Sequence, residues 1–173
     1  MAVQNSSLET QAQAPRAEAA VKPNVRMLAQ YVKEFSFNSP NAPRSLRATT
    51  EQPNLQIDVG VGQSQIDKDV YEVMIRVTGL ATNKSGAMYD LKLIYAGLFE
   101  ITGFVAAQVQ PVLFINCPAL VFPFLRQLIG DMTRAGAFSP VWLDPIDWGG
   151  LYHQRITALQ QGAKPGAIGG ALN

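Results

Sequence analysis

The stretch from Asn116 to Tyr152 constrains the fold most, because it joins an unusually apolar helix to an aromatic segment rich in proline. Asn116 or Cys117 is suited to cap the helix, and Pro118 falls in the first turn, where no N–H is needed. The helix 118–135 carries two adjacent apolar rows: Leu120, Phe124, Leu128 and Met132, and Val121, Leu125 and Ile129. A surface helix needs only one apolar face about 100° wide. We therefore expect this helix to be covered on more than one side.

Prolines and glycines divide the rest of this stretch. Pro123 lies inside the helix pattern and predicts a kink, and Gly136 is suited to a left-handed stop. We expect a short segment before the long helix, helical only ahead of Pro111, and a last helix from Asp144 or Pro145 to Gln160.

Upstream, apolar and polar residues alternate with a period of two, which predicts strands at 27–38, 55–61, 71–78 and 88–101. Residues 82–86 read as a hairpin loop, so the strands should form an antiparallel sheet with one packed and one wet face. The sequence thus predicts an α+β fold: a four-stranded antiparallel sheet with a long helix and a C-terminal helix packed on one face. Four aromatic residues should fill the sheet–helix interface: Phe35, Phe37, Tyr71 and Phe99. The wet face should collect Glu34, Asn38, Asp58, Glu72, Arg76, Asp90 and Lys92. The run 93–95 is apolar on both faces, which argues for further cover from outside the chain.

Composition bounds the class of protein. The 173 residues suit one domain over 25–160, with a flexible N-terminal arm at 1–24 and a flexible C-terminal tail at 161–173. A net charge of +1 gives no electrostatic case for nucleic acid or for a membrane surface. We find no signal peptide, and the apolar run 118–125 is far shorter than the ~20 residues of a membrane span. With a single cysteine, a soluble cytoplasmic protein is the simplest interpretation.

No constellation of residues points to an enzyme. The only histidine, His153, has no evident partner, and Cys117 reads as a small buried hydrophobe rather than a nucleophile. One histidine and one cysteine cannot build a metal site of the usual kind. Gly60-Val61-Gly62 lacks the third glycine of a dinucleotide loop and is more typical of a strand bulge or turn. We therefore expect neither catalysis nor a cofactor.

The same stretch resembles a known family. The pattern CP-x-L-x-FPFLR, followed by R-x-G-x-F-x-P-x-x-L-x-P-I-x-W-x-x-LY, is similar to the signature of SecB, the bacterial protein-export chaperone. The resemblance extends upstream through FSFNSPNAPR, DVYEV-x-x-RVT and YAG-x-F, and covers the chain from about residue 31 to residue 152.

The resemblance implies a homotetramer, a dimer of dimers with the long helices sandwiched between sheets. It implies an ATP-independent chaperone that binds unfolded precursor proteins, keeps them export-competent and delivers them to the translocase motor SecA. Three alternatives stay open: a related chaperone of a toxin–antitoxin system, a non-catalytic oligomeric adaptor, and a small-molecule binding protein with a closed pocket.

The resemblance also suggests sites. Clients would bind along the helix and the segment after it, at Leu120, Phe122, Phe124, Leu128, Phe138, Trp142 and Trp148, although core packing competes for several of these residues. Subunit contacts are implied at Leu91, Leu93 and Tyr95. SecA would bind the wet face at Glu34, Asn38, Asp90 and Lys92. This face is acidic in SecB relatives, whereas here Asn38 replaces a carboxylate and Lys92 stands where an acid is usual.

Overall fold

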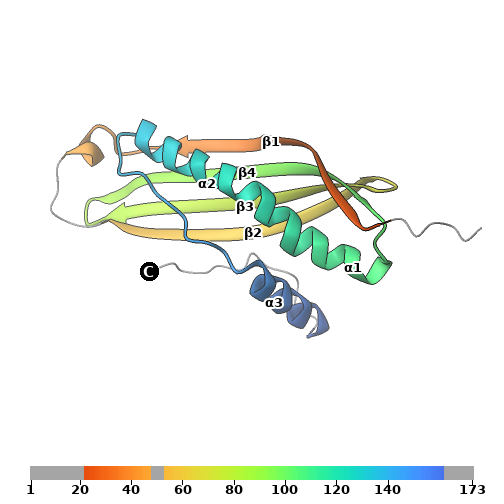
Figure 1. Cartoon of the computed structure of the whole chain (residues 1–173). Helices are drawn as coiled ribbons and strands as arrows, with labels where there is room; N and C mark the ends of the chain where they lie inside the picture. Colours follow the sequence, from red (N-terminus) through yellow and green to blue (C-terminus); the bar gives the residue numbers. More distant parts are fainter. Residues whose placement is uncertain (1–21, 48–52, 162–173) are drawn as a thin grey trace, which may run out of the picture.

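The structure is a computed structural model that describes residues 22–47 and 53–161. Four strands form one antiparallel sheet in the order β1-β4-β3-β2, as Figure 1 shows. Their bounds are β1 Asn24–Asn38, β2 Asn54–Asp67, β3 Val70–Asn83 and β4 Gly86–Thr102. The predicted strands are confirmed, and each is longer than the sequence pattern predicts.

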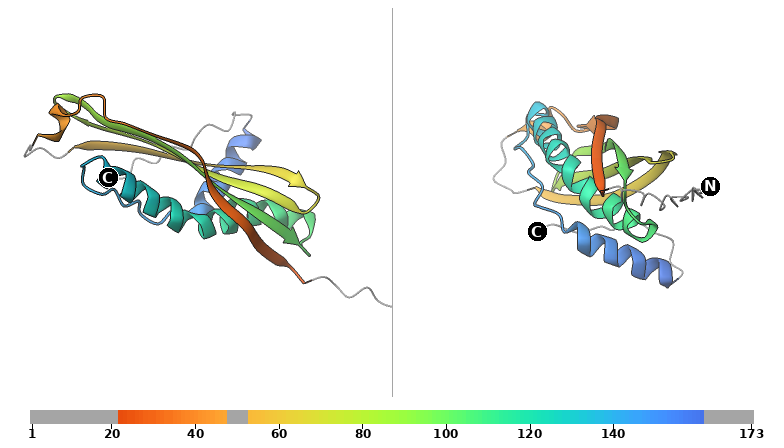
Figure 2. Two further views of the ribbon diagram at one scale, coloured as in Figure 1. Left: turned by 90° about the horizontal axis from the view of Figure 1, so that it is seen from above. Right: turned by 45° about the vertical axis from the view of Figure 1, so that its right-hand side comes forward.

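The helical elements follow the sheet, apart from a short 3₁₀ turn, η1 Arg44–Leu46, between β1 and β2. They are α1 Ala106–Pro111, the π-helical turn η2 Val112–Asn116, α2 Cys117–Ala135 and α3 Trp148–Gln160. All three α-helices lie on one face of the twisted sheet (Figure 2). The predicted α+β architecture is therefore confirmed.

The long helix starts earlier than the sequence predicts. Residues 106–135 form one helical stretch that continues through Pro111. The turn after this proline is widened, with the Cys117 N–H donating to the Val112 carbonyl five residues earlier. Asn116 is consequently helical itself and makes no side-chain cap, so the predicted capping role of Asn116 or Cys117 is wrong.

The two later helix boundaries also differ from expectation. Gly136 has a φ of −75°, and the left-handed residue is Ala137 at 64°. Gly136 is instead needed for space, because a Cβ there would lie 2.6 Å from the ring of Phe37. The last helix begins at Trp148 rather than near Pro145, because the Asp147 carboxylate accepts a hydrogen bond of 3.0 Å from the Gly150 N–H and caps it there.

The core lies between the sheet and α2. Val121, Leu125 and Ile129 point into the sheet and are fully buried. On β4 the predicted inward row is buried beneath the helices, including Leu91, Leu93 and Tyr95. These last three residues are thus core residues of the single chain, and the subunit contacts implied at them stay a prediction.

Phe35 differs from its prediction. It pairs with Leu93 and so shares the helix side of the sheet, yet it is 55% exposed. Phe35 lies on β1, an edge strand that has a neighbouring strand on one side only. Phe37, Tyr71 and Phe99 do join the core as expected.

Two further expectations concern the glycine pair and the membrane. Gly60 and Gly62 sit in regular pairing with Arg76 and Met74, so no bulge or turn occurs there. The helix 106–135 has the length and composition of a membrane span, with a mean hydropathy of 1.7, although the sequence offered only a short apolar run. Half of that apolar window is buried inside the protein, as in the core helix of a soluble protein. The predicted arm and tail lie almost wholly outside the described residues.

Candidate functional site

An apolar groove opens where the long helix passes the start of α3. The cavity has a volume of about 640 Å³ and is lined mainly by apolar side chains from β1, the long helix and the turn before α3. It contains two of the residues predicted to bind clients, Leu120 and Trp148, with Phe104 beside them. Asp147, the cap of α3, supplies a carboxylate at its wall. We call this cavity the helix groove.

One flank of α2 is left open in the single chain. Leu120, Phe124 and Leu128 follow one another at four-residue spacing, which places them on one helix flank. Leu120 and Phe124 are each 48% exposed, and Leu128 is half-buried. The prediction of cover on more than one side holds for two sides, since the sheet covers one and the segment after α2 covers another. The third side remains as an apolar stripe.

Three of the predicted client residues are packed inside the chain. Phe122 and Trp148 are buried and meet edge to face, with ring centroids 5.6 Å apart. Phe138 is half-buried against Tyr89, at 4.7 Å between centroids, with Phe37 on its other side. These aromatic residues hold the helices and the sheet together, so Phe122 and Phe138 pack in the core. Trp148 is also buried but lines part of the helix groove.

The segment 136–147 is fixed across α2 by contacts that sequence reasoning missed. The Thr133 hydroxyl, fully buried, bonds to the Ile129 carbonyl and accepts the Val141 N–H, each at 3.0 Å. Trp142 lies on Gly130, where any Cβ would stand 3.0 Å from the indole ring. Trp142 is still 48% exposed, which keeps its predicted role in ligand contact open. Thr133 could have indicated this contact, because a threonine hydroxyl buried in an apolar helix needs a hydrogen-bond partner.

The opposite, outer face of the sheet carries the four residues predicted to bind SecA. Adjacent strands β1 and β4 bring all four together. Lys92 forms an ion pair of 2.5 Å with Glu34, and the Asn38 amide donates to Asp90 at 3.0 Å. The alternation thus placed these residues correctly, but it did not reveal that they bond to one another.

Glu72 departs most from its prediction as a wet-face residue. It points to the outer face but is only 5% exposed, because Tyr31 and Lys33 reach it from β1 across β4. Lys33 Nζ bonds to both of its carboxylate oxygens at 2.8 and 2.7 Å, and Ser64 on β2 adds a bond of 3.3 Å. The hydrogen bond from Lys33, followed by that from Tyr31, lowers the pKa of Glu72. The same bond to Glu72 raises the pKa of Tyr31 to about 12.

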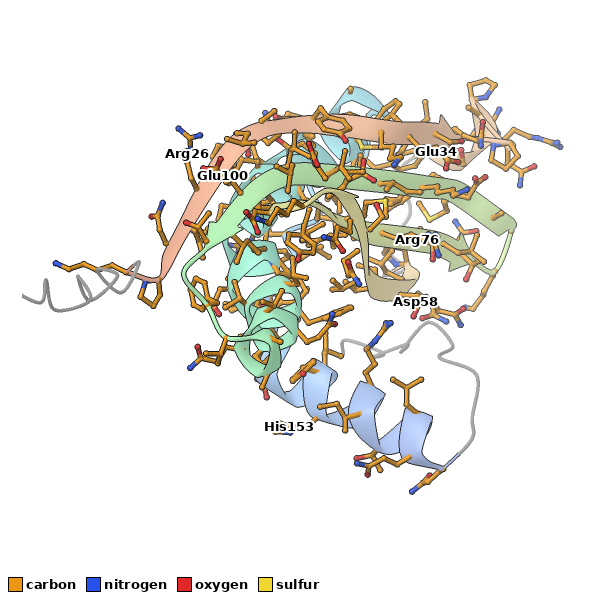
Figure 3. The ribbon with its side chains drawn as sticks, turned by 90° about the vertical axis from the view of Figure 1, so that its right-hand side faces the viewer. Arg26, Glu34, Asp58, Arg76, Glu100 and His153 are labelled. Atoms are coloured by element: carbon orange, nitrogen blue, oxygen red, sulfur yellow. The ribbon has the colours of Figure 1, made fainter. Side chains whose placement is uncertain are left out.

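The residues considered for catalysis do not come together. Burial raises the pKa of Cys117 to about 12, which keeps the thiol protonated and unreactive. His153 is exposed on α3 (Figure 3), whereas Cys117 is fully buried at the start of α2. Over residues 22–47 and 53–161, no group of three or more His, Cys, Asp or Glu side chains could hold a metal ion.

Comparison with known proteins gives one family. The family model described as preprotein translocase subunit SecB matches residues 18–159. The protein-export protein SecB of Methylocella silvestris is 42% identical over 143 residues, covering 83% of this chain and 89% of the relative. That of Bartonella bacilliformis is 40% identical over 140 residues, covering 81% and 88%.

A solved structure supports the fold. The SecB-like chaperone of Mycobacterium tuberculosis, in complex with a peptide from the HigA1 antitoxin, superposes with a TM-score of 0.58. The match covers 71% of this chain and 91% of that chain at 12% identity, so it bears on the fold alone. The resemblance read from CP-x-L-x-FPFLR is thus confirmed by the family model and by the relatives, and this chain belongs to the SecB family of preprotein translocase subunits.

Proposed function

We propose that this chain is an ATP-independent chaperone that binds unfolded precursor proteins, keeps them export-competent and hands them to the SecA motor in the cytoplasm. The observation that carries the proposal is the helix groove: an open apolar cavity of about 640 Å³ that continues onto the exposed stripe of α2. An unfolded chain exposes apolar side chains that such a surface removes from water. No nucleotide or covalent step is needed.

Client binding then follows from many weak contacts. Each apolar segment seated in a groove contributes little, but segments of one client bound at several grooves raise the effective concentration of one another. This gives tight binding with little sequence preference. Three members of the predicted client set are exposed, Leu120, Phe124 and Trp142, and we assign Leu120 and Trp142 to direct contact with clients.

The test is arrest of refolding. A denatured precursor is diluted into buffer with or without the chain, and the recovery of its native fluorescence is followed. We expect the wild-type chain to slow recovery, Leu120→Ser to do so less, and Leu159→Ser, which changes an equally exposed leucine on α3, to match wild type. Unaltered refolding in the presence of the wild-type chain would sink the proposal.

We also propose a homotetramer, a dimer of dimers. Phe124, Leu128 and Phe35 expose apolar surface on the helix side of the molecule, and a second copy that covers them would remove it from water. Light scattering should give a mass four times 18.8 kDa. Phe124→Ser should shift the chain toward smaller species, and a stable wild-type monomer at micromolar concentration would contradict this assembly.

SecA is proposed to bind the outer face at Glu34, Asn38, Asp90 and Lys92. The test is a titration of the C-terminal segment of the motor against Glu34→Lys, Asp90→Lys and Lys92→Glu. Equal affinity for all of these and wild type would remove this corner of the face from the docking site. The antitoxin-linked role remains the second candidate, since the M. tuberculosis relative in fold was solved with an antitoxin peptide. Relatives about 40% identical that are named for protein export favour the export role.

A further inference from the structure

We infer that Arg126 makes the client site prefer segments that carry a carboxylate between two large apolar side chains. One apolar side chain lies in the helix groove, the other lies against Trp142, and the carboxylate pairs with Arg126 between them. The inference rests on the proposed chaperone function and names the chemistry of the segments that the site holds best.

The helix groove and Trp142 lie at two ends of one flank of α2. The segment 136–147 runs beside this flank in the opposite direction, because Trp142 lies on Gly130 whereas the last residues of the segment line the groove beside Ala119. Ala119, Arg126 and Gly130 follow one another at spacings of seven and four residues, which places them within about 20° of one another around the helix. A client extended along this flank therefore meets the groove, Arg126 and the indole ring in that order.

The rise of the helix sets the length of the client segment. From Ala119 to Gly130 the helix rises about 16 Å, and Arg126 stands about 10 Å along this path. An extended chain advances about 3.3 Å per residue. The two apolar side chains of the client should therefore be about five residues apart, with the carboxylate about three residues after the one in the groove.

Arg126 needs a hydrogen-bond acceptor that the chain does not give it. Its side chain is half-buried, and its Nε is shielded from water but donates to no atom of residues 22–47 and 53–161. The guanidinium carbon lies 6.0 Å from the ring centre of Trp142, a cation–π contact at the limit of its range, which satisfies no N–H donor. Because a buried donor without an acceptor costs free energy, an oxygen bound at this place is favoured.

The neighbouring carboxylates do not supply that oxygen. Asp131 is paired with Arg134 at 3.3 Å. Asp144 and Asp147 are exposed on the segment 136–147, and within the described part of the chain neither forms an ion pair with Arg126. Asp147 does stand at the wall of the helix groove, where it disfavours a second carboxylate. The acidic group of a client is thus directed to Arg126 and an apolar group to the groove.

A carboxylate suits Arg126 better than a neutral acceptor does. Hydrogen bonds between a guanidinium and a carboxylate are charge-assisted and roughly twice as strong as those between neutral groups. Since Arg126 is partly exposed, we expect the gain of a favourable surface ion pair, about fivefold in affinity.

The experiment measures binding of two labelled synthetic peptides to the full chain by fluorescence anisotropy. The first has the core Phe-Ser-Ser-Glu-Ser-Phe between glycine and serine residues, and the second differs only by glutamine in place of glutamate. Both are titrated against wild type, Arg126→Gln and Arg134→Gln. Arg134→Gln is the matched control, because it removes an arginine of the same helix that is already paired with Asp131.

Wild type and Arg134→Gln should bind the glutamate peptide about fivefold more tightly than the glutamine peptide, whereas Arg126→Gln should bind both alike. The readout is a ratio of two affinities for the same protein, so a general loss of binding in a variant cancels. If Arg126→Gln fails to fold in a thermal melt, Arg126→Lys takes its place. This variant keeps a charge but loses the planar fork, and the ratio should fall to about twofold.

The failure of the inference and that of the proposed function are distinguishable. Equal affinity of wild type for the two peptides, or a preference that persists in Arg126→Gln, would overturn the inference while the chain still arrests refolding. A wild-type chain that arrests refolding but binds neither peptide would also overturn it, because clients would then bind elsewhere. A chain that neither binds the peptides nor slows refolding would overturn the proposed function itself.

Discussion

Replacing Glu72 by alanine should destabilise the chain and free its edge strand. Glu72 is the one acceptor that Tyr31, Lys33 and Ser64 share, so the variant removes bonds between β3 and both β1 and β2. A hydrogen bond to a charged group contributes about 1.5–3 kcal/mol, which applies to Tyr31. Lys33 is 45% exposed and regains water, so its share falls to that of a surface ion pair, up to about 1 kcal/mol. The Ser64 bond, at 3.3 Å, is long and adds little. The total is about 2–4 kcal/mol, or about 5–15 °C in melting temperature.

The matched control is Glu100→Ala, which breaks an ion pair of similar length, 3.0 Å to Arg26, on the same two-strand edge. The Arg26 and Glu100 side chains are 62% and 32% exposed, so losing this ion pair should lower the free energy of unfolding by less than about 1 kcal/mol. Denaturant unfolding at one protein concentration gives the free energies, and hydrogen exchange should show β1 amides opening faster only in Glu72→Ala.

The dependence on pH gives a second test of the same reasoning. Because the folded pKa of Glu72 is lowered from 4.5 by Lys33 and then Tyr31, its stabilisation is full above pH 4.5 and is lost as pH falls through the lower folded value. The advantage of wild type over Glu72→Gln should therefore shrink only in acid. If Glu72→Ala costs no more than Glu100→Ala, or if the gap to Glu72→Gln is independent of pH, the shared carboxylate does not hold β1.

Three further changes have direct outcomes. Gly136→Ala should destabilise by about 1–3 kcal/mol in thermal melts, because its Cβ would lie 2.6 Å from the ring of Phe37; an unchanged melting temperature would show that the chain yields there at no cost. Thr133→Val should cost about 1–3 kcal/mol and speed exchange of the Val141 amide, which loses its 3.0 Å acceptor; slow exchange in the variant would contradict this. Cys117, with its pKa raised to about 12 by burial, should resist iodoacetamide at about pH 8 until the chain is unfolded, as mass spectrometry would register; rapid labelling of the folded chain would exclude the buried position.

The strands and their faces were predictable because alternation with period two decides which side chains share a face. The row from Tyr89 to Phe99 on β4 reads directly from the sequence, and the structure buries it. Exposure was not predictable in the same way. The Phe35 side chain points to the helix side of the sheet, as predicted. Whether a helix covers it depends on where α2 crosses the sheet, which no local sequence pattern encodes.

The candidate sites show the same division. Phe122 and Phe124 are two residues apart in one apolar helix, and a helical turn of 100° per residue sends one inward and the other outward. The sequence could name both as aromatic but could not say which flank the sheet and the segment 136–147 would cover. Likewise Glu72 looked like any outward carboxylate, because the lysine and tyrosine that bury it lie 39 and 41 residues earlier in the chain.

The widened turn at Val112–Asn116 sets the phase of the long helix. Each residue of an α-helix advances the side chains by about 100°, so one extra residue in a turn rotates everything before it relative to everything after it. Val109 on α1 and Val121 on α2 both reach the core under this offset. Deleting one residue from the turn would restore a regular helix and its hydrogen bonds, yet it would swing Val109 by about 100° and shorten the rod by about 1.5 Å. The irregular turn thus sets the rotation of α1 relative to α2, so that one continuous helix directs apolar side chains from both parts toward the core.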